Sequence, residues 1–280
     1  MTGRPCGCLD CHPLFTDCSG GSVYYCGRYQ PPMKTTLIWD LPIRLFHWAF
    51  AASLTASLGF ALVVDDDSPL FQLHMLFGLV AAFLVGVRVV LGLVGSRHAR
   101  FANFPLRPAE TARYLLGVFT GGARTYAGNN PGSALAALAM FALVPLLTLT
   151  GVAGGGESSE DVHGVLAYIL LGVIGAHLLG LALHAIRHRD NVAAAMITGR
   201  KDSPAGDGIA SAHPVWGGVV FAAVVAWVTA LFAGHDAGAA TVKVPLIGAI
   251  VQLGECEDGE HERRGGADRG EHRDHDDDDD

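Results

Sequence analysis

Charged side chains are scarce in this chain. Asp, Glu, Lys and Arg make up 16% of its 280 residues, whereas a soluble domain carries about 25%. The deficit comes from uncharged apolar stretches of about 20 residues, the length of a helix that crosses a bilayer. The composition therefore excludes an ordinary soluble enzyme and predicts an integral membrane protein whose consecutive spans share one helical core.

Several motifs of soluble enzymes are also missing. The chain has no phosphate-binding P-loop, no dinucleotide-binding glycine fingerprint and no nucleophilic triad. No secretory signal peptide is visible, because the first long apolar run, from about Phe46, is not followed by a small-residue cleavage site. We therefore expect the first span to stay in the protein as an anchor, and we expect no nucleic-acid partner.

Acidic residues are concentrated at the C-terminus. Residues 254–280 hold 13 of the 27 acidic and 4 of the 19 basic residues, so the other 253 residues carry 14 acidic and 15 basic side chains. Charge blocks of this kind are usually disordered. We expect residues 236–280 to form an acidic, disordered tail. Such a tail could steer a basic partner protein toward the membrane surface.

Cysteine is almost confined to a leader, residues 1–33. Five of the six cysteines lie there, and Cys8-Leu-Asp-Cys11-His12 matches the C-x-x-C-H pattern of covalent haem attachment. Zinc binding is a second interpretation of the cluster. We favour a disordered leader, or translation assigned too far upstream, because Met33 would be an ordinary start.

Five apolar segments are long enough to span a membrane. The loop after the second is basic and contains a short interfacial helix from Pro108, whereas residues 65–69 and 154–161 form acidic turns. Residues 242–253 are apolar but too short to cross. The expected spans are residues 42–64, 70–94, 132–152, 162–186 and 214–233.

Loops that contain Lys and Arg alternate along the chain with loops that contain neither. Residues 65–69 and 153–161 contain none, whereas residues 95–131 contain five and residues 187–213 contain four. The positive-inside rule places the basic loops and the N-terminus in the cytoplasm. We therefore expect a multi-pass protein of the bacterial inner (cytoplasmic) membrane, with the acidic turns and, after five spans, the acidic tail facing outward.

Four histidines inside the spans form two pairs by depth. His163 and His177 are 14 residues apart on one span, so their rings leave the same helix face about 21 Å apart. In the predicted orientation His47 lies near the cytoplasmic side of its span, and His74 lies near the outer side. His47 therefore matches the depth of His177, and His74 matches that of His163.

Two imidazoles at one depth suit a haem iron. Zinc requires four ligands, and no cysteine or carboxylate lies at either depth, whereas haem iron needs only two axial groups beyond its porphyrin. We expect two haem b groups with the four histidines as axial ligands. A transporter whose histidines bind a metal ion is the non-redox alternative. The small residues that would leave room for the macrocycles are Gly78, Gly86, Gly164, Gly172 and Gly175.

Two other residues need an interpretation. Arg88 follows His74 by 14 residues, at the depth of the inner pair, where a buried cation requires a counter-charge. A haem propionate would supply it; the alternative is that Arg88 snorkels to the interface. His184 would lie about 31 Å from His163, so we interpret it as a boundary or propionate contact. His98 lies in a basic loop and is expected to be solvated.

The histidines come with recognisable neighbours. Over residues 34–201 the chain resembles the bacterial cytochrome b561 family, and in particular the haem b subunits associated with nickel–iron hydrogenases. The resemblance implies a four-helix membrane bundle with two b haems, ligated by His47, His74, His163 and His177. The motifs are Trp39-Asp-Leu-Pro-Ile-Arg-Leu-Phe-His47-Trp48, Leu73-His74-Met-Leu-Phe-Gly78, Gly95-Ser-Arg-His-Ala-Arg-Phe101 and Asp161-Val-His163 through Arg189-Asp-Asn191.

The resemblance also implies a role in electron transport. Members of the family exchange electrons between the quinone pool and a redox partner of a respiratory chain, such as a c-type cytochrome or a dehydrogenase or hydrogenase subunit. We therefore expect an electron carrier. An oxidoreductase acting on superoxide or quinone in the same fold is the alternative, and a homodimer stays open. The resemblance implies nothing about three other parts of the chain, which are the leader, residues 202–235 with the linker and fifth span, and the tail.

Overall fold

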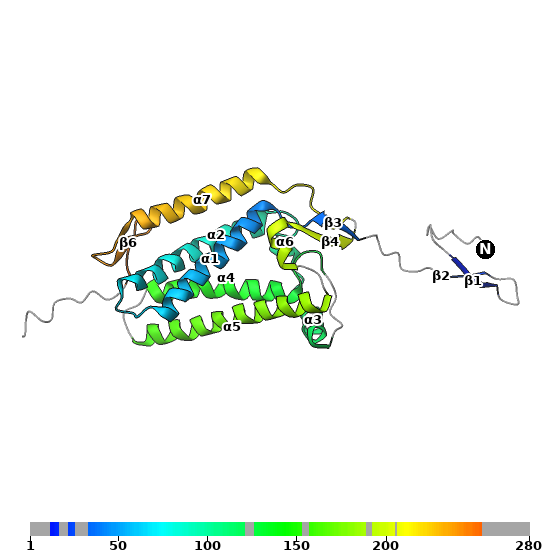
Figure 1. Ribbon diagram of the computed structural model, residues 1–280, viewed down its shortest axis with the longest axis horizontal. Helices are drawn as coiled ribbons and strands as arrows, with labels where there is room; N and C mark the ends of the chain where they lie inside the picture. The colour runs from blue at the N-terminus through cyan, green and yellow to red at the C-terminus, as the bar shows by residue number, and fades with distance from the viewer. Residues whose placement is uncertain are drawn as a thin grey trace, which may run out of the picture.

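Long parallel and antiparallel helices form an elongated bundle (Figure 1). The computed structural model describes residues 12–16, 22–25, 33–120, 126–152, 157–188, 192–204 and 206–253. Within these ranges, five helices are long and apolar enough to cross a membrane. This confirms the expected all-α membrane bundle. The five are α1 (Leu41–Val63), α2 (Gln72–Val94), α4 (Pro131–Val152), α5 (Glu157–His188) and α7 (Pro214–Ala233).

Short elements connect the long helices. Helix α3 (Pro108–Thr120) occupies the place of the expected interfacial helix, α6 (Val192–Thr198) follows α5, and two single turns of 3₁₀ helix are η1 (Pro69–Phe71) and η2 (Phe101–Asn103). The strands pair in antiparallel fashion as β1–β2, β3–β4 and β5–β6–β7. They are β1 (His12–Thr16), β2 (Ser22–Tyr25), β3 (Met33–Leu37), β4 (Arg200–Pro204), β5 (His235–Asp236), β6 (Thr241–Lys243) and β7 (Ile250–Gln252).

Local sequence explains where the helices begin. The Asp40 carboxylate accepts a hydrogen bond from the Ile43 backbone N–H at 3.1 Å and caps α1. The Asn130 side chain accepts from the Ser133 N–H at 2.8 Å and caps α4 in the same way. Helix α5 begins at Glu157, so residues 157–161 of the predicted acidic turn are helical. Acidic residues are favourable in a first helical turn, where backbone N–H groups are unpaired.

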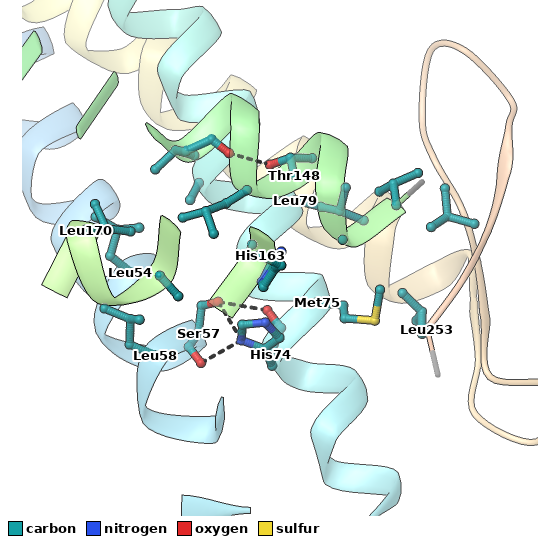
Figure 2. Close-up of a pocket in the computed structure, with 18 residues that line it drawn as sticks. Leu54, Ser57, Leu58, His74, Met75, Leu79, Thr148, His163, Leu170 and Leu253 are labelled. Atoms are coloured by element: carbon teal, nitrogen blue, oxygen red, sulfur yellow. Dashed lines mark hydrogen bonds between the residues drawn. The ribbon is translucent and has the colours of Figure 1, made fainter. Parts of the chain in front are cut away.

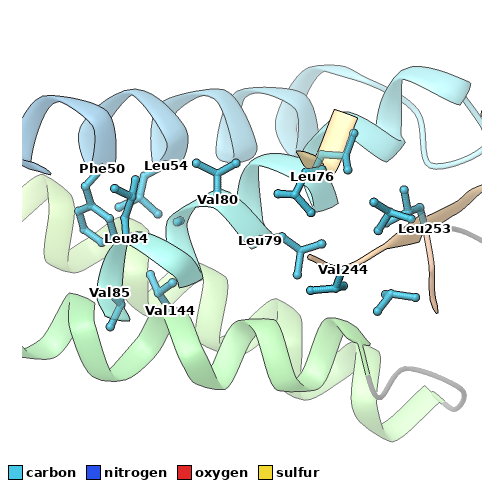
Figure 3. Packing of buried hydrophobic residues seen from close by; sticks show 14 of the residues in the cluster. Phe50, Leu54, Leu76, Leu79, Val80, Leu84, Val85, Val144, Val244 and Leu253 are labelled. Carbon is cyan, nitrogen blue, oxygen red and sulfur yellow. The ribbon is translucent and has the colours of Figure 1, made fainter. Parts of the chain in front are cut away.

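The helices pack as two pairs with α7 on one side. Helix α1 packs on α2, α4 packs on α5, and α2 also contacts α4, while α7 lies along α1 and α2 (Figure 1). Leu76 and Leu84 of α2 and Leu170 of α5 are almost fully buried in the apolar core that these helices share. Figure 3 shows this core extending from Phe50 to the segment that follows α7.

One end of the bundle is tied by β3 and β4. The Gly199 carbonyl accepts from the N–H groups of Ile38 and Trp39, at 2.8 and 3.1 Å, with Gly199 itself in the left-handed region at φ 77°. The backbone N–H of Ile209 bonds to the carbonyl of Leu37 at 2.8 Å. The first part of the segment predicted as a linker from residue 202 thus contains the end of β4 and is bonded to β3.

The opposite end carries the three-stranded sheet β5–β6–β7. Residues 236–253 were predicted to belong to a disordered tail, and the structure corrects this. The reason is alternation: Val242, Val251 and Leu253 point inward and are 0%, 8% and 1% exposed. Residues 254–280 lie outside the described residues.

The leader is described only in part. Residues His12–Thr16 and Ser22–Tyr25 pair as an antiparallel hairpin with an irregularity between Pro13 and Phe15. The disorder predicted for the leader as a whole stays a prediction. The cysteines of the C-x-x-C-H motif lie outside the described residues.

Candidate functional site

A cavity lies between the two helix pairs at the end that carries β5–β7. Its volume is about 80 Å³, and part of it is open to the surroundings. Its wall is mainly aliphatic, with contributions from α1, α2, α4 and α5. His74 and His163 are the two histidines of this wall (Figure 2).

The rings of His74 and His163 face each other across a gap. Their centroids are 6.1 Å apart and the ring planes lie at 83°. A metal–imidazole bond is about 2 Å long, so two such bonds and half of each ring together span about 6 Å. The separation therefore fits one metal ion held between two imidazoles, which is the arrangement that haem iron requires.

Hydrogen bonds orient the His74 ring. Its Nδ1 lies 2.9 Å from the backbone carbonyl oxygen of Ser57. A carbonyl oxygen only accepts, so Nδ1 carries the proton and Nε2 presents its lone pair. The Ser57 hydroxyl donates to the His74 carbonyl at 2.9 Å and further ties α1 to α2.

Thr150 orients the His163 ring in the same manner. The Thr150 hydroxyl donates to the carbonyls of Leu146 or Leu147, at 3.0 and 3.1 Å. Its single proton is therefore used, and the oxygen accepts from Nδ1 of His163 at 3.0 Å. In both histidines of the cavity Nδ1 is thus fixed by a neighbour, and no hydrogen bond to Nε2 is found within the part of the chain that the structure describes.

Glycines leave space around these rings. A Cβ atom at Gly151 would lie 3.2 Å from Cε1 of His163, and one at Gly78 would lie 3.8 Å from the Ser57 hydroxyl. Any larger side chain at either position would enter the cavity. The other four glycines for which we predicted room for a macrocycle do not line this cavity, and that expectation stays a prediction: Gly86, Gly164, Gly172 and Gly175.

The second histidine pair lies deeper in the bundle. His47 and His177 are close enough to interact electrostatically, and both are half-buried. Nδ1 of His47 is buried and has no hydrogen-bond partner among the described residues. An orphaned imidazole nitrogen at this depth is costly, so this pair also has ligand capacity that the described protein groups do not use.

Arg88 is buried at the same depth. It is 4% exposed, so it does not snorkel to solvent. Its Nη2 donates to the Ala99 carbonyl at 2.9 Å, while Nη1 has no partner among the described residues. Four aromatic rings surround the guanidinium, with centroids 4.5 to 6.0 Å from its carbon: Phe46, Phe101, Phe104 and Phe141.

Two histidines outside the pairs are at least half-buried. His184 is 7% exposed, and its role as a boundary or propionate contact stays a prediction. His98 is half-buried, and its Nε2 lies 2.7 Å from the Asp207 carbonyl while its ring contacts Trp39 edge-on. Its expected solvation is wrong because the segment after β4 folds back over it.

Sequence reasoning missed Ser57 and Thr150. Both are small hydroxyl residues inside apolar spans, where such side chains usually bond to a neighbouring helix or to the preceding turn. That signal was present, but the histidine that Ser57 meets is 17 residues away in the chain and the one that Thr150 meets is 13 residues away. Only the packing of α1 on α2 and of α4 on α5 reveals which histidine each one meets.

The described residues do not form a protein-only metal centre. No group of three or more His, Cys, Asp or Glu side chains within them lies close enough to hold a metal ion. A structural zinc site needs four such ligands. The paired histidines therefore fit a metal that arrives with most of its ligands, as haem iron does.

Comparison with known proteins identifies a family. A family model described as prokaryotic cytochrome b561 matches residues 38–199, more than half of the chain. This range contains both histidine pairs and ends before α7. No curated protein and no solved structure matches.

Proposed function

The chain belongs to the prokaryotic cytochrome b561 family of membrane b-type cytochromes, and we propose that it passes electrons between the membrane quinone pool and a partner redox protein through two haems. Membership makes it a multi-pass bacterial membrane protein that binds haem b and acts in electron transfer. The number of haems, the quinone and the partner are our proposal. Helix α7 and the sheet that follows it lie outside the matched region.

The histidine pair of the cavity carries the proposal. The ring centroids of His74 and His163 lie 6.1 Å apart, and in each ring Nδ1 is the nitrogen that bonds to a neighbour among the described residues, which supports one haem between α2 and α5. A bound haem iron with two axial imidazoles supplies one-electron transfer without an open coordination position. The chain's part is to orient both rings and to surround them with aliphatic side chains that exclude water.

The second haem is proposed between His47 and His177. These residues lie one each on α1 and α5, and His177 is about 21 Å along α5 from His163. The two sites would therefore lie one above the other across the membrane. Arg88 supports this position, since its unpartnered Nη1 is a buried donor for an anionic group such as a haem propionate.

The charge of the loops supports an orientation. The basic loops follow α2 and α5 and the N-terminal segment is also basic, so we propose that this end of the bundle faces the cytoplasm of the inner membrane. The His74–His163 site then lies near the outer surface. A quinone on one side and a protein partner on the other would make the two sites a path across the membrane.

Cofactor content is the first test of this proposal. Purified protein should contain two haem b groups per chain, both extractable with acid acetone because no covalent bond holds them, with low-spin spectra because each iron has two imidazole ligands. Absorption spectra, a pyridine assay and reduction by a quinol analogue measure this. A colourless protein, a single haem, or haem that quinol does not reduce would contradict the proposal. Haem that resists extraction would show that the C-x-x-C-H motif is used.

Thr150 allows a test of the outer site alone. Replacing Thr150 by Val removes the acceptor of the His163 Nδ1 proton. The imidazole then becomes a weaker donor to ferric iron, so the midpoint potential of one haem should rise and its affinity should fall about 10-fold. Redox titration and haem content measure both effects.

Thr148 provides the matched control. Its hydroxyl donates to the Val144 carbonyl at 2.9 Å, with no bond to a histidine among the described residues, and it lines the same cavity on the same helix. Thr148→Val should leave both potentials unchanged. Equal shifts in the two variants would mean that the Thr150 effect comes from changed packing rather than from its bond to His163.

A further inference from the structure

The segment after the fifth helix covers the outer cavity. Residues 235–253, here called the cap, contain β5, β6 and β7 and lie outside the range that matches the family. Val251 and Leu253 of the cap nevertheless line the cavity together with His74 and His163 (Figure 2). The wall of this site is therefore completed by a part of the chain that the family match does not include.

The cap presents an apolar surface to the bundle. Val242, Val244, Val251 and Leu253 are at most 8% exposed and belong to the main hydrophobic core (Figure 3). Leu253 also closes the sheet, since its N–H donates to the Ala240 carbonyl at 2.6 Å. The cap is thus packed on the ends of the helices as part of the core.

Hydrogen bonds hold the cap at the start of α2. The Gln72 side chain is buried, and its Oε1 lies 2.6 Å from Nε2 of His235. Its Nε2 donates to the Ala237 carbonyl at 3.4 Å. Helix α7, which leads into the cap, is itself packed on α2, with Trp227 stacked on Phe83 at 4.4 Å between ring centroids. Gln72 lies two residues before His74, so the attachment is next to the metal-binding ring.

We propose that the cap is a specificity-determining element, which shields the outer haem from water-soluble redox molecules. Val251 and Leu253 form part of the cavity wall, so they would separate a haem held there from a small polar oxidant or reductant that approaches from the covered end. Electrons would then leave or enter at this site only through a partner that docks on the covered end or through the other haem. The inference rests on the proposed function, because it requires a haem at His74 and His163.

Two truncations test the cap in the otherwise full chain. One removes residues 235–280 and so lacks both cap and tail; the other removes residues 254–280 and keeps the cap. Each dithionite-reduced protein is mixed with ferricyanide, which takes one electron from ferrous haem to give ferrocyanide and ferric haem without a proton. High salt screens the net charge of −9 on residues 254–280. Oxidation should be about 10-fold faster without the cap and unchanged without the tail alone.

Point variants decide the matter if the shorter chain does not fold. Val251→Ser with Leu253→Ser opens the cavity wall, whereas Leu246→Ser with Ile250→Ser changes two residues of the cap that are 92% and 73% exposed. The first pair should accelerate ferricyanide oxidation and lower the midpoint potential of one haem, since water stabilises the charged ferric form. The second pair should do neither.

The outcomes separate this inference from the function beneath it. If the full chain holds two haems but both pairs of point variants show the same oxidation rate and the same midpoint potentials, the cap does not shield the haem. The electron-transfer function would still stand. A full chain without the outer haem would overturn both. Faster oxidation and a lower potential that are confined to the Val251 and Leu253 pair establish the shielding.

Discussion

Replacing His74 by alanine is expected to remove one of the two haems and leave the other in place. His163→Ala should have the same effect, because the centroids of the two rings are 6.1 Å apart. The loss of either ring leaves a single axial ligand. Haem content should therefore fall from two to one per chain. The remaining haem should keep its spectrum and midpoint potential, since the second pair lies about 21 Å away along α5.

The second pair should respond in the opposite way. His47→Ala or His177→Ala should remove the inner haem and spare the outer one, which can be seen by comparing the low-temperature spectra of the four variants. His184→Ala is the control: it is seven residues from His177 and buried, but we do not assign it as a ligand. Loss of the inner haem from His184→Ala, with His177→Ala harmless, would show that the ligand assignment is wrong.

Arg88→Met should have the second largest effect, on the inner haem. Methionine keeps the aliphatic stem but removes the cation and leaves no donor for an anionic propionate. Without a nearby positive charge, the ferric form of that haem is easier to reach, so its midpoint potential should fall. The inner haem should also be bound more weakly, as seen in haem content after purification and in a redox titration.

Two control variants test the interpretation of Arg88. Arg88→Lys keeps the charge but loses the planar fork, so it should recover most of the potential and less of the haem affinity. Arg97→Met removes an exposed arginine whose ion pair with Asp207, at 3.5 Å, lies at the same end of the bundle, and it should change neither. Unchanged potentials in Arg88→Met would mean that Arg88 only ties α2 to the Ala99 carbonyl and the surrounding Phe rings.

Local sequence was sufficient to predict the membrane spans. Charge scarcity and the length of apolar runs placed all five, and α7 begins and ends at the residues that were predicted. Asp40, Pro42 and Pro131 also mark helix starts by their own chemistry, since each acts on the first turn of the helix that it begins. These features depend on neighbours in the chain and on the bilayer, so they can be derived without knowing the packing.

The histidine pairing could also be predicted, because depth in a membrane is one-dimensional. Helix rise and loop charge assign each histidine a height, and His74 then matches His163 without any knowledge of which helices touch. The structure brings these two rings together and places His47 near His177. That the four are haem ligands stays a prediction, tested by the alanine variants above.

Only the tertiary structure decided what surrounds the histidines. The alternation of Val242, Val251 and Leu253 is visible in the chain, but its burial depends on packing against helices up to about 200 residues earlier. The same holds for the Phe rings around Arg88 and for the bond between Thr150 and His163. A hydrogen bond or an aromatic contact requires two groups within a few ångströms of each other. The periodicity of apolar residues in the sequence does not indicate which distant residue will be the partner. The sequence by itself therefore determined the spans and the heights of the ligands, whereas packing determined the orientation, the lining and the cover of the site.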